Sequence, residues 1–221
     1  MYDAVVFDVD GVILRRHPDY PSVYRDAVRD AFRAFDVDPS PEDVESFFGG
    51  ASKSLAEMRA TCDRHDIDLE TFWPERERRS AALQRRMIER GDRVLYDDVS
   101  VLSTLAETHA LGFVSSNQHE TIEFVVEHFD LADDLETFHG RRPTVDGFER
   151  TKPDTHYLDA ALDDLETRDA LYVGDGGHDV VAAHRAGLDS AFVWRDHRDG
   201  YDLPESPTHE VDRLTDLLDV I

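Results

Sequence analysis

The chain has 221 residues, of which 40% are hydrophobic and 10% aromatic, and this composition supports a buried core and excludes a disordered chain. It carries 49 acidic and 24 basic residues, a formal net charge of −25 at pH 7, so its surface repels nucleic-acid phosphates and anionic membranes and we expect neither as a partner. Because the acidic excess is spread along the whole chain, we expect a halophilic protein of a salt-rich cytoplasm, where screening weakens self-repulsion.

Cysteine usage and the apolar stretches narrow the class of protein further. Cys62 is the only cysteine in the sequence, which excludes an internal disulfide and a cysteine-based metal site, so we expect a small buried side chain there. The first residues lead directly into a strand-like run and lack the basic and apolar regions of a secretion signal. No apolar stretch approaches the length of a membrane span. These features predict a soluble, cytoplasmic protein.

Five short apolar runs are predicted to be β-strands. In chain order they are Ala4–Phe7, Gly112–Val114, Thr137–Phe138, Ala170–Val173 and Ser190–Trp194. Helical patterns alternate with the later strands and close the chain; they cover Val99–His109, Thr121–His128, Asp154–Asp163, Asp179–Ala186 and Val211–Leu218. Gly187 is predicted to end the fourth of these helices. The alternation predicts an α/β fold, a parallel sheet with helices on both faces.

The stretch between the first and second strands contains helical patterns and no convincing strand. These patterns cover Val23–Phe35, Pro41–Phe48, Ser54–His65 and Leu69–Arg90. Pro18 and Pro21 mark one boundary, and Gly91 with Asp92 marks the other. We therefore expect a core of residues 1–17 and 92–221, and an all-helical domain of residues 18–91 inserted after the first strand, with its two chain crossings acting as a hinge.

The first candidate site is Asp8-Val9-Asp10-Gly11, at the end of the first predicted strand. Two carboxylates leaving a strand can hold a metal ion and a phosphoryl group, and Gly11 lets the backbone turn sharply and approach a ligand. Asp-Gly is also an ordinary turn signal, so the tetrapeptide alone leaves a simple turn open.

Two further candidates follow along the chain. Ser115, Ser116 and Asn117 come directly after the second predicted strand, at the sheet edge where α/β folds bind ligands, so we expect Ser115 and the amides after it to contact phosphate. We interpret Asn117 as a helix cap, because Glu120 follows it at capping-box spacing. Lys152 precedes a helix and its point charge suits a phosphate or a carboxylate, although a solvated lysine stays open.

A fourth candidate is Gly174-Asp175-Gly176-Gly177-His178-Asp179, again directly after a strand. Magnesium prefers oxygen ligands and commonly takes one or two carboxylates together with phosphate oxygens and water. We expect His178 to be a neighbour of the site, because imidazole matches magnesium poorly. A loop in which Asp179 caps the next helix remains open.

Together the four segments resemble the haloacid dehalogenase superfamily. Its four motifs are matched in order by Asp8-Val9-Asp10-Gly11-Val12, Ser115, Lys152-Pro153 and Gly174-Asp175-x-x-x-Asp179. The resemblance covers essentially the whole chain and points to the phosphoglycolate phosphatase-like subgroup with a helical cap. It implies a Rossmann-like parallel sheet whose site is covered by the mobile helical insertion.

The resemblance also implies a role for each residue. Asp8 attacks phosphorus and forms an aspartyl-phosphate, while Asp10 acts first as general acid and then as general base. Asp8, the backbone carbonyl of Asp10 and Asp175 hold Mg²⁺, with Asp179 as a further ligand or support. Ser115, Ser116 and Lys152 bind the phosphoryl charge. The expected catalytic, phosphate-binding and metal-binding residues are therefore Asp8, Asp10, Ser115, Ser116, Lys152, Asp175 and Asp179.

Asp10 favours phosphate-ester hydrolysis over dehalogenation, because members that dehalogenate 2-halo acids lack this second aspartate and need no metal. A sugar phosphomutase of the same family stays an alternative, since it uses the same motifs. A non-catalytic binding or regulatory scaffold is a third, although such proteins usually lose an acidic position and none is lost here.

The substrate is predicted only by family analogy as a small phosphorylated metabolite, such as phosphoglycolate or a sugar phosphate. Lys53, in the glycine- and serine-rich loop at 48–54, could face a second anionic group, or the loop could be a simple helix–helix turn. Contacts of Arg15, Arg16 and Arg141 with substrate stay open. The basic run of the long inserted helix is expected to be a solvated face paired with acids; it comprises Arg76, Arg78, Arg79, Arg85 and Arg86.

Overall fold

The protein is described by a computed structural model that covers residues 2–18, 20–48 and 55–221. Its chain divides into two compact units. The first comprises Met1–Arg16, Arg93–Arg141 and Phe148–Ile221, and the second comprises His17–Asp92 and Arg142–Gly147. Among the described helices, none is both long and apolar enough to cross a membrane.

The first unit is built on a six-stranded sheet with the order β3-β2-β1-β4-β5-β6. Every neighbouring pair is parallel. The strands are β1 (Ala4–Phe7), β2 (Ala110–Gln118), β3 (Thr137–Arg141), β4 (Ala170–Gly174), β5 (Asp189–Val193) and β6 (His209–Val211). The predicted parallel sheet of an α/β fold is therefore confirmed.

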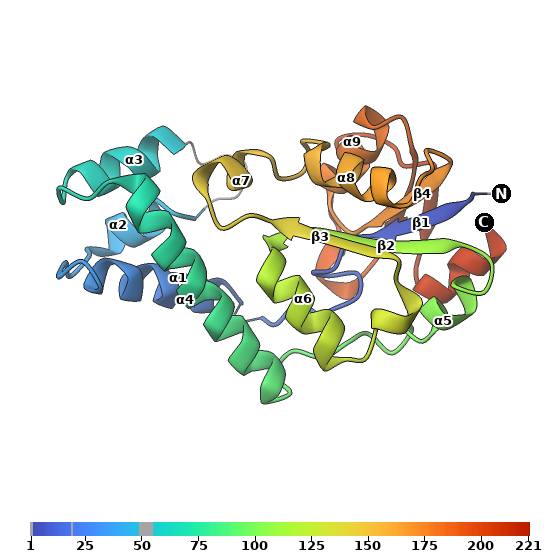
Figure 1. The fold of residues 1–221 in the computed structure, drawn as a ribbon, viewed down its shortest axis with the longest axis horizontal. Helices are drawn as coiled ribbons and strands as arrows, with labels where there is room; N and C mark the ends of the chain where they lie inside the picture. The colour runs from blue at the N-terminus through green and yellow to red at the C-terminus, as the bar shows by residue number, and fades with distance from the viewer. Residues whose placement is uncertain (1, 19, 49–54) are drawn as a thin grey trace. The chain divides into compact units, whose positions relative to one another are not determined.

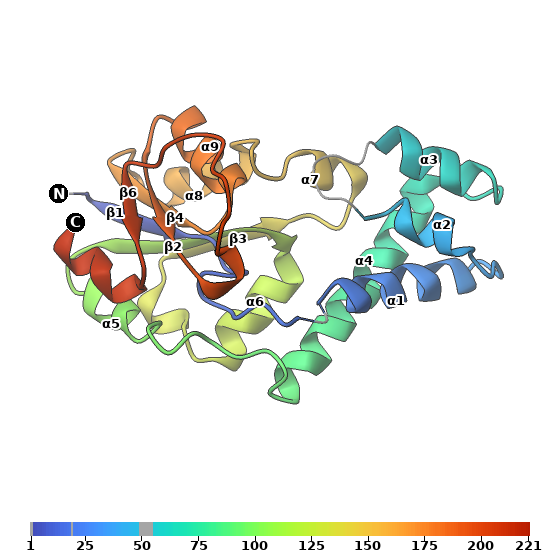
Figure 2. The same ribbon diagram turned by 180° about the vertical axis from the view of Figure 1, so that it is seen from behind.

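Helices cover both faces of this sheet, as the sequence predicts. Figures 1 and 2 show α8 and α9 on one face and α5 and α6 on the other. These helices span α5 (Val101–Leu105), α6 (His119–His128), α8 (His156–Asp164) and α9 (Gly177–Arg185). Successive strand residues point to opposite faces, so Val6 and Tyr172 join the core beneath α8 and α9, whereas Phe7 packs edge-on against Phe113.

The end of the chain differs from its prediction. The segment predicted as one amphipathic helix, Val211–Leu218, instead completes the edge strand β6 and then forms a 3₁₀ helix, η4 (Leu214–Asp219). The hydrogen bond from the Trp194 backbone N–H to the Val211 carbonyl shows why: pairing with the open edge of β5 satisfies backbone groups that a helix would have used internally. Gly187 does end α9, with a φ of +77°.

The second unit is helical. Its described helices are α1 (Tyr20–Arg33), α2 (Pro41–Glu45), α3 (Leu55–Asp63) and α4 (Leu69–Glu89), and it also takes the first residues of α7 (Val145–Glu149). Its core is aromatic: the ring of Phe72 lies 4.5 Å from that of Phe32 and 5.1 Å from that of Phe47. Cys62 is fully buried, as expected. The role of this unit as a cap stays a prediction.

The basic run on α4 is a solvated face with one exception. Arg78 and Arg79 both pair with Glu75 one turn away, at 2.8 and 2.7 Å. Arg76, however, is buried and pairs with Glu77, so its assignment to the solvated face was wrong. The guanidinium of Arg76 lies 5.1 Å from the ring of Trp73, and this planar cation packs on aromatic surface more readily than an ammonium would.

Candidate active site

Three neighbouring strands end at the same edge of the sheet and bring the candidate residues together. Asp8 follows β1, Ser115 lies near the end of β2, and Asp175 follows β4. Because β2, β1 and β4 are adjacent and parallel, their carboxyl ends form one edge, the usual place for a ligand in an open α/β sheet. Lys152 reaches this edge from the turn before α8.

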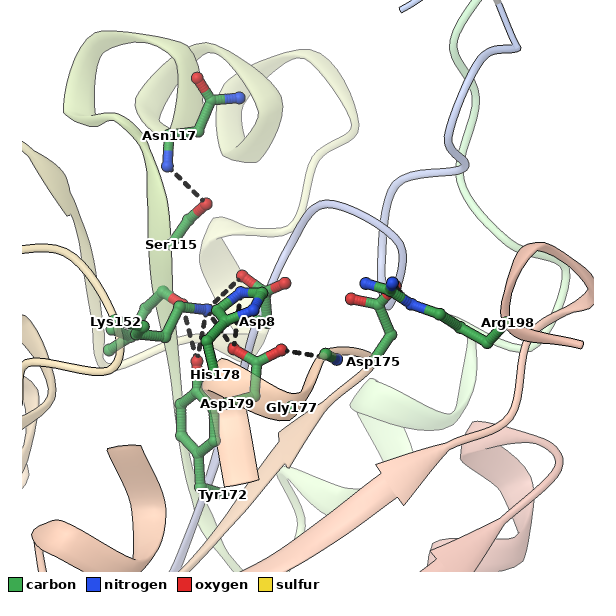
Figure 3. Close-up of polar contacts among 12 residues, drawn as sticks. Asp8, Ser115, Asn117, Lys152, Tyr172, Asp175, Gly177, His178, Asp179 and Arg198 are labelled. Carbon is green, nitrogen blue, oxygen red and sulfur yellow. Dashed lines mark hydrogen bonds and ion pairs between the residues drawn. The ribbon is translucent and has the colours of Figure 1, made fainter. Parts of the chain in front are cut away.

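Lys152 is the centre of a buried polar network (Figure 3). Its Nζ donates to Asp8 Oδ1 at 2.7 Å and to the Tyr172 hydroxyl at 2.8 Å, and it lies 2.6 Å from Asp179 Oδ1. The Tyr172 hydroxyl in turn donates to the Val114 carbonyl at 3.0 Å. Burial lowers the pKa of Lys152, but Asp179 and Asp8 raise it further, so the net pKa lies well above its ordinary value. The lysine is therefore a fixed positive charge.

The carboxylates outnumber this cation. Ligand oxygens of Asp8, Asp175 and Asp179 all lie within 4.8 Å of one another, and all three residues are buried. Burial raises the pKa of Asp8, Lys152 lowers it, and Asp179, Asp175 and Asp10 raise it again, which brings the net pKa to about 8. The three carboxylates therefore exceed the single positive charge of Lys152, as expected for a cluster that takes a further cation.

Two observations fit a divalent cation here. The donors are carboxylate oxygens, which Mg²⁺ prefers. In addition, Asp175 Oδ1 is buried and has no hydrogen-bond partner among the described residues, and a buried oxygen in that state needs a partner from outside the chain. Asp8, Asp175 and Asp179 thus have the chemistry and proximity of a magnesium site.

Glycine lets the loop between β4 and α9 close around these carboxylates. A Cβ on Gly174 would lie 2.3 Å from the side chain of Asp179, so no larger residue fits without displacing it. Asp179 Oδ2 accepts the Gly176 N–H at 2.9 Å, and its other oxygen faces Lys152. Asp179 therefore both caps the start of α9 and belongs to the charged cluster. His178 Nε2 lies 3.6 Å from Asp179 Oδ1.

Asp10 is held by different partners from Asp8. Its Oδ1 pairs with the guanidinium of Arg93, whose side chain is fully buried. Its Oδ2 accepts from Asn117 Nδ2 at 2.9 Å. Asp10 therefore offers its side chain to Arg93 and Asn117, and its carboxylate does not belong to the group of potential metal ligands found among the described residues.

The prediction that Asn117 caps a helix was wrong. The strand β2 runs through Asn117 to Gln118, and Gln118 occupies the position before α6 without a side-chain cap. The Ser115 hydroxyl accepts the Asn117 N–H at 3.1 Å, and Asn117 Oδ1 accepts the Gln118 N–H at 2.9 Å. The side chains of Ser115 and Asn117 therefore bind backbone N–H groups at the irregular end of β2, and the Asn117 amide nitrogen donates to Asp10.

The serines of β2 lie at the same sheet edge. Ser115 is almost fully buried, and the Ser116 hydroxyl is buried without a hydrogen-bond partner in the described part of the chain. Arg141 Nε donates to the Ser116 carbonyl at 2.8 Å, and its guanidinium lies 5.8 Å from the Phe148 ring. Arg141 therefore supports the end of β2 by a backbone contact.

The other basic residues that could contact substrate have different neighbours. Arg16 lies 3.5 Å from Asp175 Oδ2, whereas Arg15 pairs at 3.1 Å with the exposed Asp97. Lys53 lies outside the described residues, so its predicted contact with substrate stays a prediction.

Sequence reasoning missed several residues that complete the site: Asn117 as a partner of Asp10, Arg93, Tyr172, His197 and Arg198. His197 Nε2 lies 2.5 Å from Asp175 Oδ2, and Arg198 Nε donates to the same oxygen at 3.0 Å. The position of His197 and Arg198, three and four residues after the predicted strand Ser190–Trp194, was an available signal, because residues that follow a strand so closely lie near the same sheet edge. No comparable signal marked Arg93.

With this geometry established, known proteins provide a comparison. The model of the haloacid dehalogenase-like hydrolase family matches residues 5–193. The chain is 25% identical over 240 residues to the pyrophosphatase PpaX of Bacillus thuringiensis (strain Al Hakam), with 99% of this chain and 96% of PpaX covered.

Solved structures show the same fold. CbbY of Rhodobacter sphaeroides, crystallised in complex with phosphate, superimposes with a TM-score of 0.66 at 18% identity, covering 98% of this chain and 96% of CbbY. YfnB of Bacillus subtilis, crystallised bound to magnesium, gives 0.58 at 16% identity, covering 99% and 98%. The Rossmann-like α/β fold implied by the sequence resemblance is thus confirmed.

Proposed function

We propose that this chain, which belongs to the haloacid dehalogenase-like hydrolases, is a magnesium-dependent phosphatase that hydrolyses a small phosphate monoester. One observation carries the proposal: Lys152 binds Asp8 at 2.7 Å within a buried cluster of three carboxylates that has the donor set of a magnesium site. A carboxylate with one oxygen fixed by a buried lysine, beside a cation site, is suited to attack a bound phosphoryl group.

In the first step, an oxygen of Asp8 forms a bond to phosphorus as the bond from phosphorus to the leaving alkoxide breaks. Asp10 donates a proton to that alkoxide, which leaves as an alcohol. In the second step, Asp10 takes a proton from water, the resulting oxygen attacks phosphorus, and the bond to Asp8 breaks. Inorganic phosphate is released and both aspartates return to their starting state.

The partners of Asp10 support this acid–base role. Arg93 and Asn117 each bind one oxygen of its carboxylate, which restricts rotation of the side chain. A group that transfers a proton must lie within hydrogen-bond reach of the reacting atom, so a fixed orientation favours the transfer.

Mg²⁺ would be held by Asp8, the backbone carbonyl of Asp10 and Asp175, with Asp179 beside them. When bound, it would neutralise charge on the phosphoryl group and reduce its repulsion from the Asp8 carboxylate. Lys152 and the hydroxyls of Ser115 and Ser116 would bind the remaining phosphoryl oxygens. The Ser116 hydroxyl, which is buried and has no hydrogen-bond partner among the described residues, supports this assignment.

We assign the substrate to the small phosphorylated metabolites, phosphoglycolate or a sugar phosphate. CbbY supports this class, because it was also crystallised in complex with xylulose-(1,5)-bisphosphate. PpaX is a pyrophosphatase, so pyrophosphate is included in the test. The test measures phosphate release from p-nitrophenyl phosphate, phosphoglycolate, sugar phosphates and pyrophosphate, with Mg²⁺ and up to several molar KCl.

The variant Asp8→Asn, which has nearly the same shape and lacks the carboxylate, is the control. We expect Mg²⁺-dependent release by the wild type and none by the variant. Equal rates for the two proteins at every salt concentration would sink the proposal. Rapid release from pyrophosphate alone would keep the chemistry and correct the substrate class.

A further inference from the structure

Asp175 is held by three positively charged or polar nitrogen groups at a single oxygen. Its Oδ2 lies 2.5 Å from His197 Nε2, 3.0 Å from Arg198 Nε and 3.5 Å from an Arg16 terminal nitrogen. The Asp175 side chain is completely buried. We call Arg16, His197 and Arg198 the Asp175 clamp.

The two oxygens of Asp175 have opposite surroundings. Oδ2 is occupied by the clamp, while Oδ1 has no hydrogen-bond partner among the described residues. Figure 3 shows the carboxylate between Asp8 on one side and Arg198 on the other. The clamp therefore occupies one oxygen of the carboxylate and leaves the other for a partner from outside the chain.

The clamp is anchored to the sheet and to the loop of Asp175. His197 and Arg198 form the 3₁₀ helix η3 (Asp196–Arg198), which follows β5. The Arg198 guanidinium lies 4.7 Å from the ring of Tyr201, whose hydroxyl accepts the Gly177 N–H at 3.2 Å. The Tyr201 ring also stacks on that of Phe192 in β5.

The base of the same segment is equally constrained. Arg195 donates to both oxygens of Asp98, at 2.8 and 3.1 Å, and to the Val12 carbonyl at 2.8 Å. Val12 belongs to the loop that carries Asp8 and Asp10. The segment after β5 is therefore tied by hydrogen bonds to the loops after β1 and β4, between which its side chains lie.

We propose that Arg16, His197 and Arg198 are positioning residues that fix Asp175 for a divalent cation, with Oδ1 as the coordinating oxygen. This inference rests on the proposed function only in treating Asp175 as a metal ligand. With Oδ2 occupied, the carboxylate is directed to bind through Oδ1, and the clamp restricts its rotation.

Removing the clamp has two opposing effects on cation affinity. Loss of a nearby positive charge strengthens the attraction between Asp175 and a cation, whereas loss of orientation weakens it. Partners that orient metal ligands typically contribute about 10- to 100-fold to metal affinity. The second effect therefore wins in a buried site, where a freed carboxylate would also be repelled by Asp8 and Asp179.

The experiment measures Mn²⁺ binding to the metal-free full chain without substrate, from the electron paramagnetic resonance signal of free Mn²⁺. We expect His197→Ala and Arg198→Ala to bind about 10- to 100-fold more weakly than the wild type. His197→Gln should recover part of the loss, because its amide nitrogen can donate to Oδ2. Arg16→Gln, at a partly exposed position, should show a smaller loss in the same direction.

Arg15→Gln is the matched control. Arg15 lines the same cavity of about 320 Å³ as Arg16 and His197, yet it pairs with Asp97, so its loss should leave Mn²⁺ affinity unchanged. Circular dichroism and urea unfolding check that each variant folds. If the His197 and Arg198 variants do not fold, the Mn²⁺ affinity of Arg16→Gln tests the proposal.

The outcomes separate the two proposals. Wild-type affinity in folded clamp variants overturns the clamp alone. Equal losses in Arg15→Gln and the clamp variants also overturn it, since a general disturbance of the shared cavity, and not the loss of orientation at Asp175, would then explain them. A wild type that binds no Mn²⁺ overturns the metal site of the proposed function.

Discussion

Charged side chains pair in opposite ways in the two units. At the sheet edge, Lys152 is 2% exposed and pairs with Asp8, which lies 144 positions earlier in the sequence. On α4 of the second unit, Arg85 is 60% exposed and pairs with Glu89 one turn away. Buried pairs between distant residues place charges at a site, whereas exposed local pairs add little stability and keep the surface hydrated.

This contrast predicts where a substitution has a large effect. The largest is expected for Asp8→Asn, which should lower kcat by at least about 10³-fold, the scale on which loss of a nucleophile acts. Phosphate release under identical salt and Mg²⁺ measures it. The contrasting variant Glu89→Gln should keep full activity, and comparable losses in the two would remove the distinction between the units.

Lys152→Met should cost about 3–5 kcal/mol of unfolding free energy, because it leaves the Asp8 and Asp179 carboxylates buried without their cation. Urea unfolding of the metal-free protein measures this loss. Added Mg²⁺ should restore part of the stability, since a ligand that binds only the folded state stabilises it. An unchanged urea midpoint in the metal-free variant would contradict the importance of the buried pair.

Asn117→Ala should lower kcat about 10- to 100-fold by freeing the Asp10 carboxylate, a part of the 10²- to 10⁴-fold that general acid–base catalysis contributes. Steady-state kinetics on p-nitrophenyl phosphate test it. Mn²⁺ affinity should stay at the wild-type value, because the Asp10 side chain is outside the group of potential ligands. A variant that loses Mn²⁺ binding instead would place Asn117 in the support of the metal site.

Asp98, in the first unit, is expected to make the stability of the protein depend on pH. Burial raises its pKa, but two bonds from Arg195 and the Leu214 N–H lower it more, so the net pKa lies below the ordinary value of 3.8. Its contribution to stability is therefore complete above pH 3.8 and is lost as the pH falls through the folded-state value.

Asp98→Asn should accordingly be less stable than the wild type by about 1.5 kcal/mol at neutral pH, the lower range for hydrogen bonds to charged groups. The difference should shrink below about pH 3.8 as the wild-type carboxylate becomes protonated. Urea unfolding at several pH values measures the gap, and a gap that widens on acidification would show the wrong sign.

The smallest effect is expected on α4. Glu89→Gln breaks an exposed pair with Arg85, and such pairs are screened by salt and carry an entropic cost. The urea midpoint should stay within experimental error, at low and at molar KCl. A clear loss would show that the surface pairs of this acidic chain stabilise it more than exposed pairs usually do.

The contrast between buried pairs of distant residues and exposed pairs of nearby residues also explains which parts of the site could be predicted from the sequence. Asp8, Ser115 and Asp175 each follow a predicted strand, so the parallel sheet alone predicts that they meet at one edge. Arg93 could not be found in this way, because it lies in a segment without regular structure and meets Asp10 only in the folded chain. Asn117 was misassigned because its spacing to Glu120 fits a cap equally well.

The prediction for the carboxyl-terminal segment was wrong for a different reason. In Val211–Leu218 the apolar positions suit a helix, yet the first residue completes β6 and the rest forms η4. A three-residue strand has too few positions to show an alternating pattern, and its pairing with β5 is a property of the sheet. Such edges depend on tertiary contacts more than on local preference.

Gly11 offers a way to disable the protein without altering any charge. Its φ is +99°, and a Cβ there would lie 2.5 Å from Asp175 Oδ2 and 2.9 Å from Arg16 Nε. Gly11→Ala should therefore disable the site by a steric clash alone. The added methyl group would push against a buried carboxylate, while every acidic and basic residue stays in the sequence. Gly11 has no reactive group, yet its lack of a side chain allows Asp175 and Arg16 to lie close to the loop that carries Asp8 and Asp10.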